Sequence, residues 1–128
     1  MVIDTSALVA ILEDEPERRA FIENIEAADV RLLSAANFVE ASIVIEARRG
    51  AEGQRLLDLF VERAGIEITP VDLEQAREAR LAFSRFGKGR HEAGLSFGDC
   101  FSYALAVTSG EPLLFRGSDF THTDVTSA

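Results

Sequence analysis

Two carboxylates follow short apolar runs at opposite ends of the chain. Asp4 comes directly after Met1-Val2-Ile3, and Asp119 lies just beyond the apolar run 112–115. If both runs are strands of one parallel sheet, both acids lie at the edge where open α/β sheets bind ligands. From its own stretch alone, Asp4 fits equally well as the cap of the helix that follows. The other acids must decide between these interpretations.

Two further carboxylates lie on segments with helical spacing. Glu40 is followed one turn later by Ile43 and Val44, and a carboxylate on an apolar helix face is rarely buried without a partner. This favours a functional Glu40 over a half-exposed surface glutamate. Asp99 falls in the first turn of an expected helix, where an acid commonly complements the helix dipole. On its own, Asp99 would be interpreted as such a helix residue, and it becomes a functional candidate only because the other three acids are present.

Four carboxylates at one sheet edge cannot all stay ionised without a counter-charge. Either protonation or a divalent metal ion would relieve the repulsion, and oxygen ligands suit Mg²⁺ or Mn²⁺. A zinc site is not indicated, because Cys100 is the single cysteine and His91 and His122 lack ligand spacing. The acids therefore indicate a site for a hard divalent cation.

Composition narrows the class of protein. A length of 128 residues predicts one domain, 1–128, and the 47% apolar content is that of a globular chain. No apolar run approaches a bilayer span, the N-terminus lacks a signal peptide, and one cysteine suits a reducing cytoplasm. The net charge of −9 argues weakly against nucleic acid binding through the whole surface. A local basic patch is nevertheless present in the segment 85–91, called here the basic loop, with Arg85, Lys88 and Arg90.

The elements that must position these residues alternate between strands and helices. Strands are expected at 1–3, 30–33, 66–69 and 112–115, with a further short edge strand at 123–125. Helices are expected in between, with Pro16 in a first helical turn, Gly50 as a stop signal, and caps at Ser34 and Asp72. This order predicts an α/β fold: a parallel sheet of four to five short strands flanked by helices in three layers.

At these residues the sequence resembles the PIN-domain family, and especially the VapC-type ribonuclease toxins of bacterial toxin–antitoxin pairs. The resemblance covers the whole chain, and the matching stretches come in the family's order. They are Val2-Ile3-Asp4-Thr5-Ser6-Ala7-Leu8, Asn37-Phe38-Val39-Glu40, Ser96-Phe97-Gly98-Asp99-Cys100 and Leu113-Leu114-Phe115-Arg116-Gly117-Ser118-Asp119-Phe120.

The resemblance implies a Mg²⁺- or Mn²⁺-dependent endoribonuclease that inhibits translation by cutting tRNA, rRNA or mRNA. It implies a homodimer and a cognate VapB-type antitoxin. The implied metal ligands and catalytic acids are Asp4, Glu40, Asp99 and Asp119, with supporting hydroxyls at Thr5, Ser6 and Ser118. The segment around Asp119 departs from the Asn-Asp-rich form common in the family, so Asp124 is a possible helper there.

Other interpretations remain open at this point. The basic loop is expected to contact RNA phosphates, although a solvated surface loop fits its composition equally well. A catalytically silent RNA- or protein-binding module on the same fold is the alternative function. A phosphatase that forms an aspartyl-phosphate and a phospho-accepting receiver domain both fall behind. Ser6 stands where the phosphatase needs a second acid, and the only lysine, Lys88, comes before the last strand.

Overall fold

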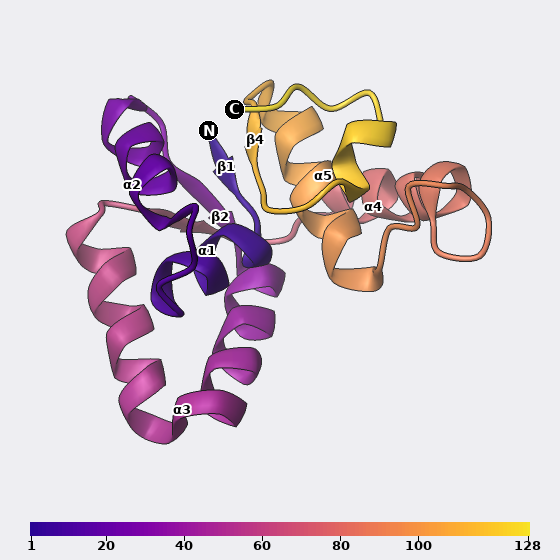
Figure 1. Ribbon diagram of the computed structural model, residues 1–128. Helices are drawn as coiled ribbons and strands as arrows, with labels where there is room; N and C mark the ends of the chain where they lie inside the picture. The colour runs from indigo at the N-terminus through magenta and orange to yellow at the C-terminus, as the bar shows by residue number, and fades with distance from the viewer.

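A four-stranded parallel sheet lies at the centre of the computed structural model, which describes residues 1–128 (Figure 1). The strands are β1 (Val2–Ile3), β2 (Leu32–Ser34), β3 (Glu67–Thr69) and β4 (Leu113–Leu114). Their order in the sheet is β3-β2-β1-β4, and all neighbours are parallel. The carboxyl ends of β1 and β4 therefore lie side by side. The predicted α/β fold is confirmed, with four strands.

Helices cover both faces of the sheet. One face packs against α1 (Thr5–Leu12), α2 (Arg18–Ala27) and α3 (Ala35–Arg63), and the other packs against α4 (Leu73–Phe86) and α5 (Phe97–Ser109). Successive residues of each strand alternate between the faces. Val2 and Leu113 belong to the core beneath α4 and α5, whereas Ile3 and Leu114 belong to the core beneath α1 and α3. Burial on both faces explains why the strands are continuous apolar runs.

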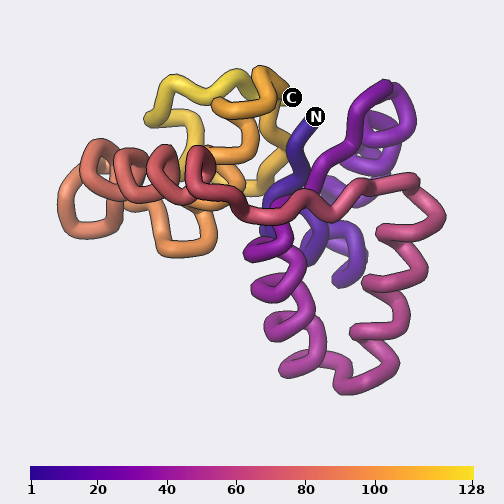
Figure 2. Tube along the Cα trace, turned by 180° about the vertical axis from the view of Figure 1, so that it is seen from behind, coloured from indigo at the N-terminus to yellow at the C-terminus, as the bar shows by residue number.

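The long helix α3 is interrupted at Gly50, where the sequence predicts a stop. Gly50 has a φ of 63° and a ψ of −153°, a conformation that is accessible to glycine but strained for other residues. The two halves of α3 fold back on each other as a hairpin that projects from the sheet (Figure 2). Their close approach needs a second glycine, because a Cβ at Gly53 would lie 2.6 Å from Ile45 Cγ2.

The predicted helix caps at Ser34 and Asp72 are present and set where α3 and α4 begin. The Ser34 hydroxyl accepts from the backbone N–H of Ala36 at 3.3 Å, and the Asp72 carboxylate accepts from that of Gln75 at 2.8 Å. At the other end of α5, Gly110 adopts the left-handed conformation of a helix stop, with φ 72°. These caps satisfy backbone groups that would otherwise be unpaired.

Three local predictions were wrong. No strand forms at 123–125; instead the short 3₁₀ helix η1 (Asp119–His122) precedes a bend, and only Ser127 bridges to Leu113. The Thr123 hydroxyl donates to the Phe120 carbonyl, and the Asp124 carboxylate accepts from the Tyr103 hydroxyl on α5, so both side chains hold the bend. Pro16 lies before α2 rather than in its first turn, because Asp14 turns the chain with a φ of 54°. The second strand begins at Leu32, which pairs with Val2, the first residue of β1.

No helix combines the length and the apolar character that crossing a bilayer requires.

Candidate active site

Asp4 is the most buried of the predicted acids, with only 2% of its surface exposed. Its Oδ2 accepts from the backbone N–H of Ser6 at 3.0 Å and from the Ser6 hydroxyl at 2.6 Å. Its Oδ1 accepts from the hydroxyl of Ser102 on α5. Burial raises the pKa of Asp4 above its ordinary value despite these hydrogen bonds, and the charge of Glu40 adds to the rise. Asp4 therefore caps α1 and also presents a carboxylate at the end of β1, so the two interpretations are compatible.

Asp99 likewise has a local role and a place among the acids. Its Oδ2 accepts from the Ser96 backbone N–H at 2.9 Å while Ser96 Oγ accepts from the Asp99 N–H at 3.2 Å, which forms a capping box at the start of α5. Burial, together with the charges of Asp4 and Asp119, raises the pKa of Asp99 from 3.8 to about 6, although the Ser96 hydrogen bonds act in the opposite direction. A helix cap without acidic neighbours would show no such repulsion.

Asp119 is exposed at the start of η1 and accepts no hydrogen bond. Its charge nevertheless acts on Asp99. Ser118 is exposed, and its hydroxyl contacts none of the acids. Asp124 points elsewhere: its carboxylate accepts from the Tyr103 hydroxyl at 2.6 Å and pairs with Arg85, and the Tyr103 hydrogen bond lowers the pKa of Asp124. Asp119, and not Asp124, is the acid at this edge.

Glu40 reaches the site across the N-terminus of α5. Its carboxylate packs directly on the Cα of Gly98, where any Cβ would overlap it. Asn37, one turn earlier on α3, donates from Nδ2 to Glu40 Oε1 at 3.4 Å. Because the charge of Glu40 raises the pKa of Asp4, these two carboxylates are electrostatically coupled. The structure thus links Asp4 to Glu40 and Asp99, and Asp99 to Asp119.

Sequence reasoning missed three residues of this site. Asn37 and Ser102 are fully buried and hydrogen-bonded to the acids, and Gly98 makes room for Glu40. The available signal was spacing: Asn37 precedes Glu40 by three positions and Ser102 follows Asp99 by three, so each shares a helix face with an acid. Of the predicted supporting hydroxyls, Ser6 contacts Asp4 directly.

Thr5 contacts the site indirectly, through Asn37. Its hydroxyl accepts from Asn37 Nδ2 at 3.3 Å and is 3.4 Å from the Asn37 carbonyl oxygen. Thr5 is buried at the start of α1. It therefore helps to join α1 to α3 beside Asp4.

The side chains of this site offer oxygen atoms as possible metal ligands and lack positively charged partners. None of Asp4, Glu40, Asp99 and Asp119 forms an ion pair with an arginine, lysine or histidine. No three side chains among histidine, cysteine, aspartate and glutamate are arranged as a ready ligand set for a metal ion. The carboxylates of Asp4 and Asp99 instead accept hydrogen bonds at the helix starts. Carboxylates without a basic partner, one of them deeply buried, fit a hard divalent cation.

The predicted RNA-binding residues belong to the C-terminal turn of α4 and to the loop that follows it, a segment that can be traced in Figure 1. Arg85 pairs with Asp124 at 3.5 Å and stacks over the ring of Phe86 at 4.6 Å. Arg90 lies 5.7 Å from the ring centre of Phe83, and Lys88 is exposed. None of the three basic side chains pairs with the four acids, and Lys88 and Arg90 form no ion pair at all, so these two charges are free to meet an anion.

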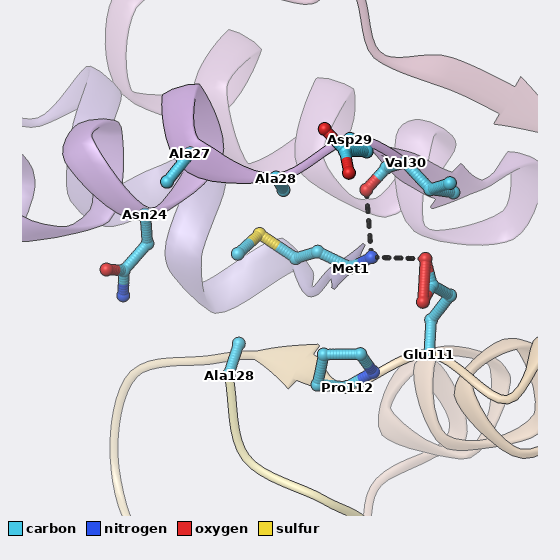
Figure 3. Close-up of a pocket in the computed structure, with 9 residues that line it drawn as sticks. All are labelled: Met1, Asn24, Ala27, Ala28, Asp29, Val30, Glu111, Pro112 and Ala128. Atoms are coloured by element: carbon cyan, nitrogen blue, oxygen red, sulfur yellow. Dashed lines mark hydrogen bonds and ion pairs between the residues drawn. The ribbon is translucent and has the colours of Figure 1, made fainter.

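A hollow of about 520 Å³ lies at the opposite end of β1 (Figure 3). There the N-terminal ammonium donates to the Val30 carbonyl at 2.8 Å and to Glu111 Oε1 at 2.9 Å. These contacts join β1 to the segments before β2 and β4. Of the two acids that line the hollow, Asp29 and Glu111, the second is paired with the ammonium, and we assign the hollow a structural role.

Comparison with known proteins agrees with this geometry. The PIN domain family matches residues 1–125. VapC ribonuclease Mb0640 of Mycobacterium bovis is 55% identical over 125 residues, covering 98% of this chain and 95% of that protein. Ribonuclease VapC of Mycolicibacterium smegmatis is 56% identical, covering 98% of this chain and 97% of its own length.

Solved structures show the same fold at low sequence identity. Mycobacterium tuberculosis VapC20, described as a sarcin-ricin loop cleaving toxin, superposes with a TM-score of 0.80 at 16% identity over 99% of this chain and 97% of its own. A toxin–antitoxin complex from Klebsiella pneumoniae gives 0.71 at 16% identity over 99% and 95%. Together with the sequence relatives, these likenesses identify the chain as a member of the PIN-domain family, in its VapC branch.

Proposed function

We propose that this chain is a Mg²⁺- or Mn²⁺-dependent endoribonuclease and the toxin of a toxin–antitoxin pair, which inhibits translation by cutting RNA in the cytoplasm. The observation that carries the proposal is the set of four carboxylates at the carboxyl edge of the sheet without a basic counter-charge, in which Glu40 repels Asp4, and Asp4 and Asp119 repel Asp99. The names of relatives at 55% identity support the ribonuclease activity. The acids support the proposed dependence on a cation, because the names of the relatives mention no cation.

In this proposal Asp4, Glu40, Asp99 and Asp119 hold the cation. A divalent ion bound there would polarise a phosphodiester oxygen and lower the pKa of a water molecule. The residues of the chain provide the geometry. Ser6 orients Asp4 through two hydrogen bonds, and Asn37 orients Glu40. Asp119 is exposed, so the site is open on the side from which a large polyanion must approach.

The basic loop is proposed to bind phosphates of the RNA beside this site. Its charges are exposed and not paired with the catalytic acids, and it directly precedes the segment that carries Asp99. Phosphate contacts position a nucleic acid without reading its sequence. The proposed substrate is therefore a cellular RNA of the tRNA, rRNA or mRNA class, chosen by features outside the acid cluster.

Two protein partners are proposed, a VapB-type antitoxin and a second copy of the chain. The antitoxin is supported by structural neighbours that are themselves toxin–antitoxin complexes, including VapBC2 of Rickettsia felis. The second copy is supported by an apolar surface on α3 and the start of α5. There Phe97 is 78% exposed and Ile43 is 64% exposed, with Val39 beside them. An exposed apolar patch of this kind is typical of an interaction surface.

Cleavage of a defined RNA by the purified protein tests the activity. We expect cleavage with Mg²⁺ or Mn²⁺, none in EDTA, and none by the Asp4→Asn variant at any metal concentration. Asp72→Asn is the matched control, because Asp72 also caps a helix but has no acidic partner in the site. If the wild-type protein binds RNA but shows no metal-dependent cleavage, the result would favour the catalytically silent binding module over the nuclease. Cleavage by Asp4→Asn that remains sensitive to EDTA would overturn the assignment of Asp4.

A further inference from the structure

Two polar side chains are fully buried between Asp4 and Glu40. Asn37 on α3 and Ser102 on α5 each have no exposed surface. The Ser102 hydroxyl lies 2.5 Å from Asp4 Oδ1 and 3.0 Å from Asn37 Oδ1. Residues that are 98 and 65 positions apart in the chain are thereby joined in one hydrogen-bonded group. Neither side chain faces solvent, so neither is placed to touch RNA.

The Asn37 amide connects this group to the surrounding elements. Its Nδ2 lies 2.9 Å from the Gly98 carbonyl oxygen, 3.3 Å from Thr5 Oγ1 and 3.4 Å from Glu40 Oε1. The start of α5 is thus tied to α3, and the Glu40 carboxylate is held against Gly98. One amide fixes the relative position of three elements that carry the acids.

Burial of these groups needs a reason, because an apolar residue of similar size avoids the cost of removing an amide or hydroxyl from water. Both side chains have hydrogen-bond partners, which offset the cost of burying them and also fix their geometry. Those partners are the Asp4 and Glu40 carboxylates, the Gly98 carbonyl, the Thr5 hydroxyl and, between Ser102 and Asn37, each other. Around a metal site, groups of this kind orient the ligands, and their loss typically weakens metal binding or activity about 10–100-fold.

We propose that Asn37 and Ser102 are positioning residues, which hold the Asp4 and Glu40 carboxylates at the spacing that cation binding requires. Ser102 fixes the rotamer of Asp4 through Oδ1, opposite the Ser6 contacts on Oδ2. Asn37 fixes Ser102 and Glu40 at the same time. This inference rests on the proposed metal-dependent nuclease.

Mn²⁺ binding to the full chain, without RNA, tests the role of Ser102. Ser102→Ala removes the hydroxyl while keeping a good helix former. We expect its Kd for Mn²⁺, measured by titration calorimetry, to rise about 10–100-fold. Ser109→Ala is the matched control, because Ser109 lies on the same helix but donates only to backbone carbonyls. Its Kd should equal that of wild type.

RNA cleavage gives the second readout. The Ser102→Ala deficit should shrink as Mn²⁺ is raised. At saturating Mn²⁺ the KM for RNA should equal that of wild type, because neither proposed positioning residue contacts RNA. Asn37→Ala, which also releases Glu40, should show a larger rise in Kd. It serves as the independent variant should Ser102→Ala fail to fold.

The outcomes separate the inference from the proposed function. A folded Ser102→Ala protein, checked by circular dichroism, that binds Mn²⁺ as tightly as wild type would overturn the positioning role while the nuclease stands. Loss of melting temperature with unchanged Mn²⁺ affinity would do the same, since it marks a purely structural residue. If wild type itself neither binds Mn²⁺ nor cleaves RNA with it, the proposed function fails, and the positioning role fails with it.

Discussion

Neutralising Asp99 should stabilise the metal-free protein at neutral pH. The pKa of Asp99 is raised from 3.8 to about 6 by burial and by the charges of Asp4 and Asp119. A rise of about two units corresponds to about 3 kcal/mol of destabilisation by the ionised form. Asn at this position keeps an oxygen that can accept from the Ser96 N–H but loses up to about 1 kcal/mol of interaction with the helix dipole. We therefore expect Asp99→Asn to gain about 2 kcal/mol in EDTA at pH 7.

The sign and the pH window follow from the direction of the shift. Because the folded pKa lies above the unfolded one, ionisation of Asp99 costs stability in full above pH 6 and costs nothing below about pH 4. The advantage of the variant should fall to about half at pH 5 and vanish near pH 4. In thermal melts a gain of 2 kcal/mol corresponds to roughly 6–10 °C for a chain of this length.

Metal should reverse the order of the two proteins. A cation that binds only the folded site stabilises wild type by about 2.7 kcal/mol at a concentration 100 times its Kd. The Asp99→Asn variant should gain much less. Asp72→Asn is the control for a capping aspartate outside the cluster and should follow wild type with Mn²⁺. An Asp99→Asn protein that melts below wild type in EDTA at pH 7, yet gains as much from Mn²⁺, would refute the coupling of these acids.

Three further predictions address the rest of the site. Gly98→Ala should leave the melting temperature in EDTA nearly unchanged, because the flexible Glu40 carboxylate can swing away from the new methyl group, but Mn²⁺ affinity and RNA cleavage should fall. Replacing the three basic side chains of the basic loop by alanine should flatten the salt dependence of RNA binding by up to about 2 in log–log slope, whereas an unchanged slope would exclude phosphate contacts there. Ile43→Asp should convert the expected dimer to a monomer of 14.0 kDa in light scattering, and an unchanged mass would place the dimer contact elsewhere.

The placement of Asp4 shows what sequence reasoning could achieve. An apolar run followed by an acid and a hydroxyl pair predicts both a strand and a helix cap, and the parallel-sheet rule then places Asp4 at the site edge. The same rule places Asp119 beside β4. Both predictions need only local patterns and one rule of topology. The edge strand at 123–125 failed because its tendency to be extended was weaker than the contact of Asp124 with Tyr103.

Ser102 shows where such reasoning ends. Its spacing of three from Asp99 places it on a helix face with that acid, but no pattern pairs a serine inside an apolar helix with an aspartate 98 positions away. Such a pair depends on how α5 packs on the sheet, which neither hydrophobic period nor capping signals determine. Gly98 is similar, because a glycine in a first helical turn indicates nothing until Glu40 of another helix is found against it.

The shortage of positive charge at the acids has a consequence for how substrate and cation interact. RNA that approaches four carboxylates at an edge of a chain with net charge −9 meets repulsion unless a cation is bound. In the proposed function the basic loop supplies the attraction, although its charges do not pair with these acids. A divalent ion bound at the acids would then favour RNA binding, and by reciprocity RNA would tighten the binding of the ion. The two equilibria would form one linked process, so the affinity for RNA measured in EDTA should be lower than the affinity measured with Mn²⁺.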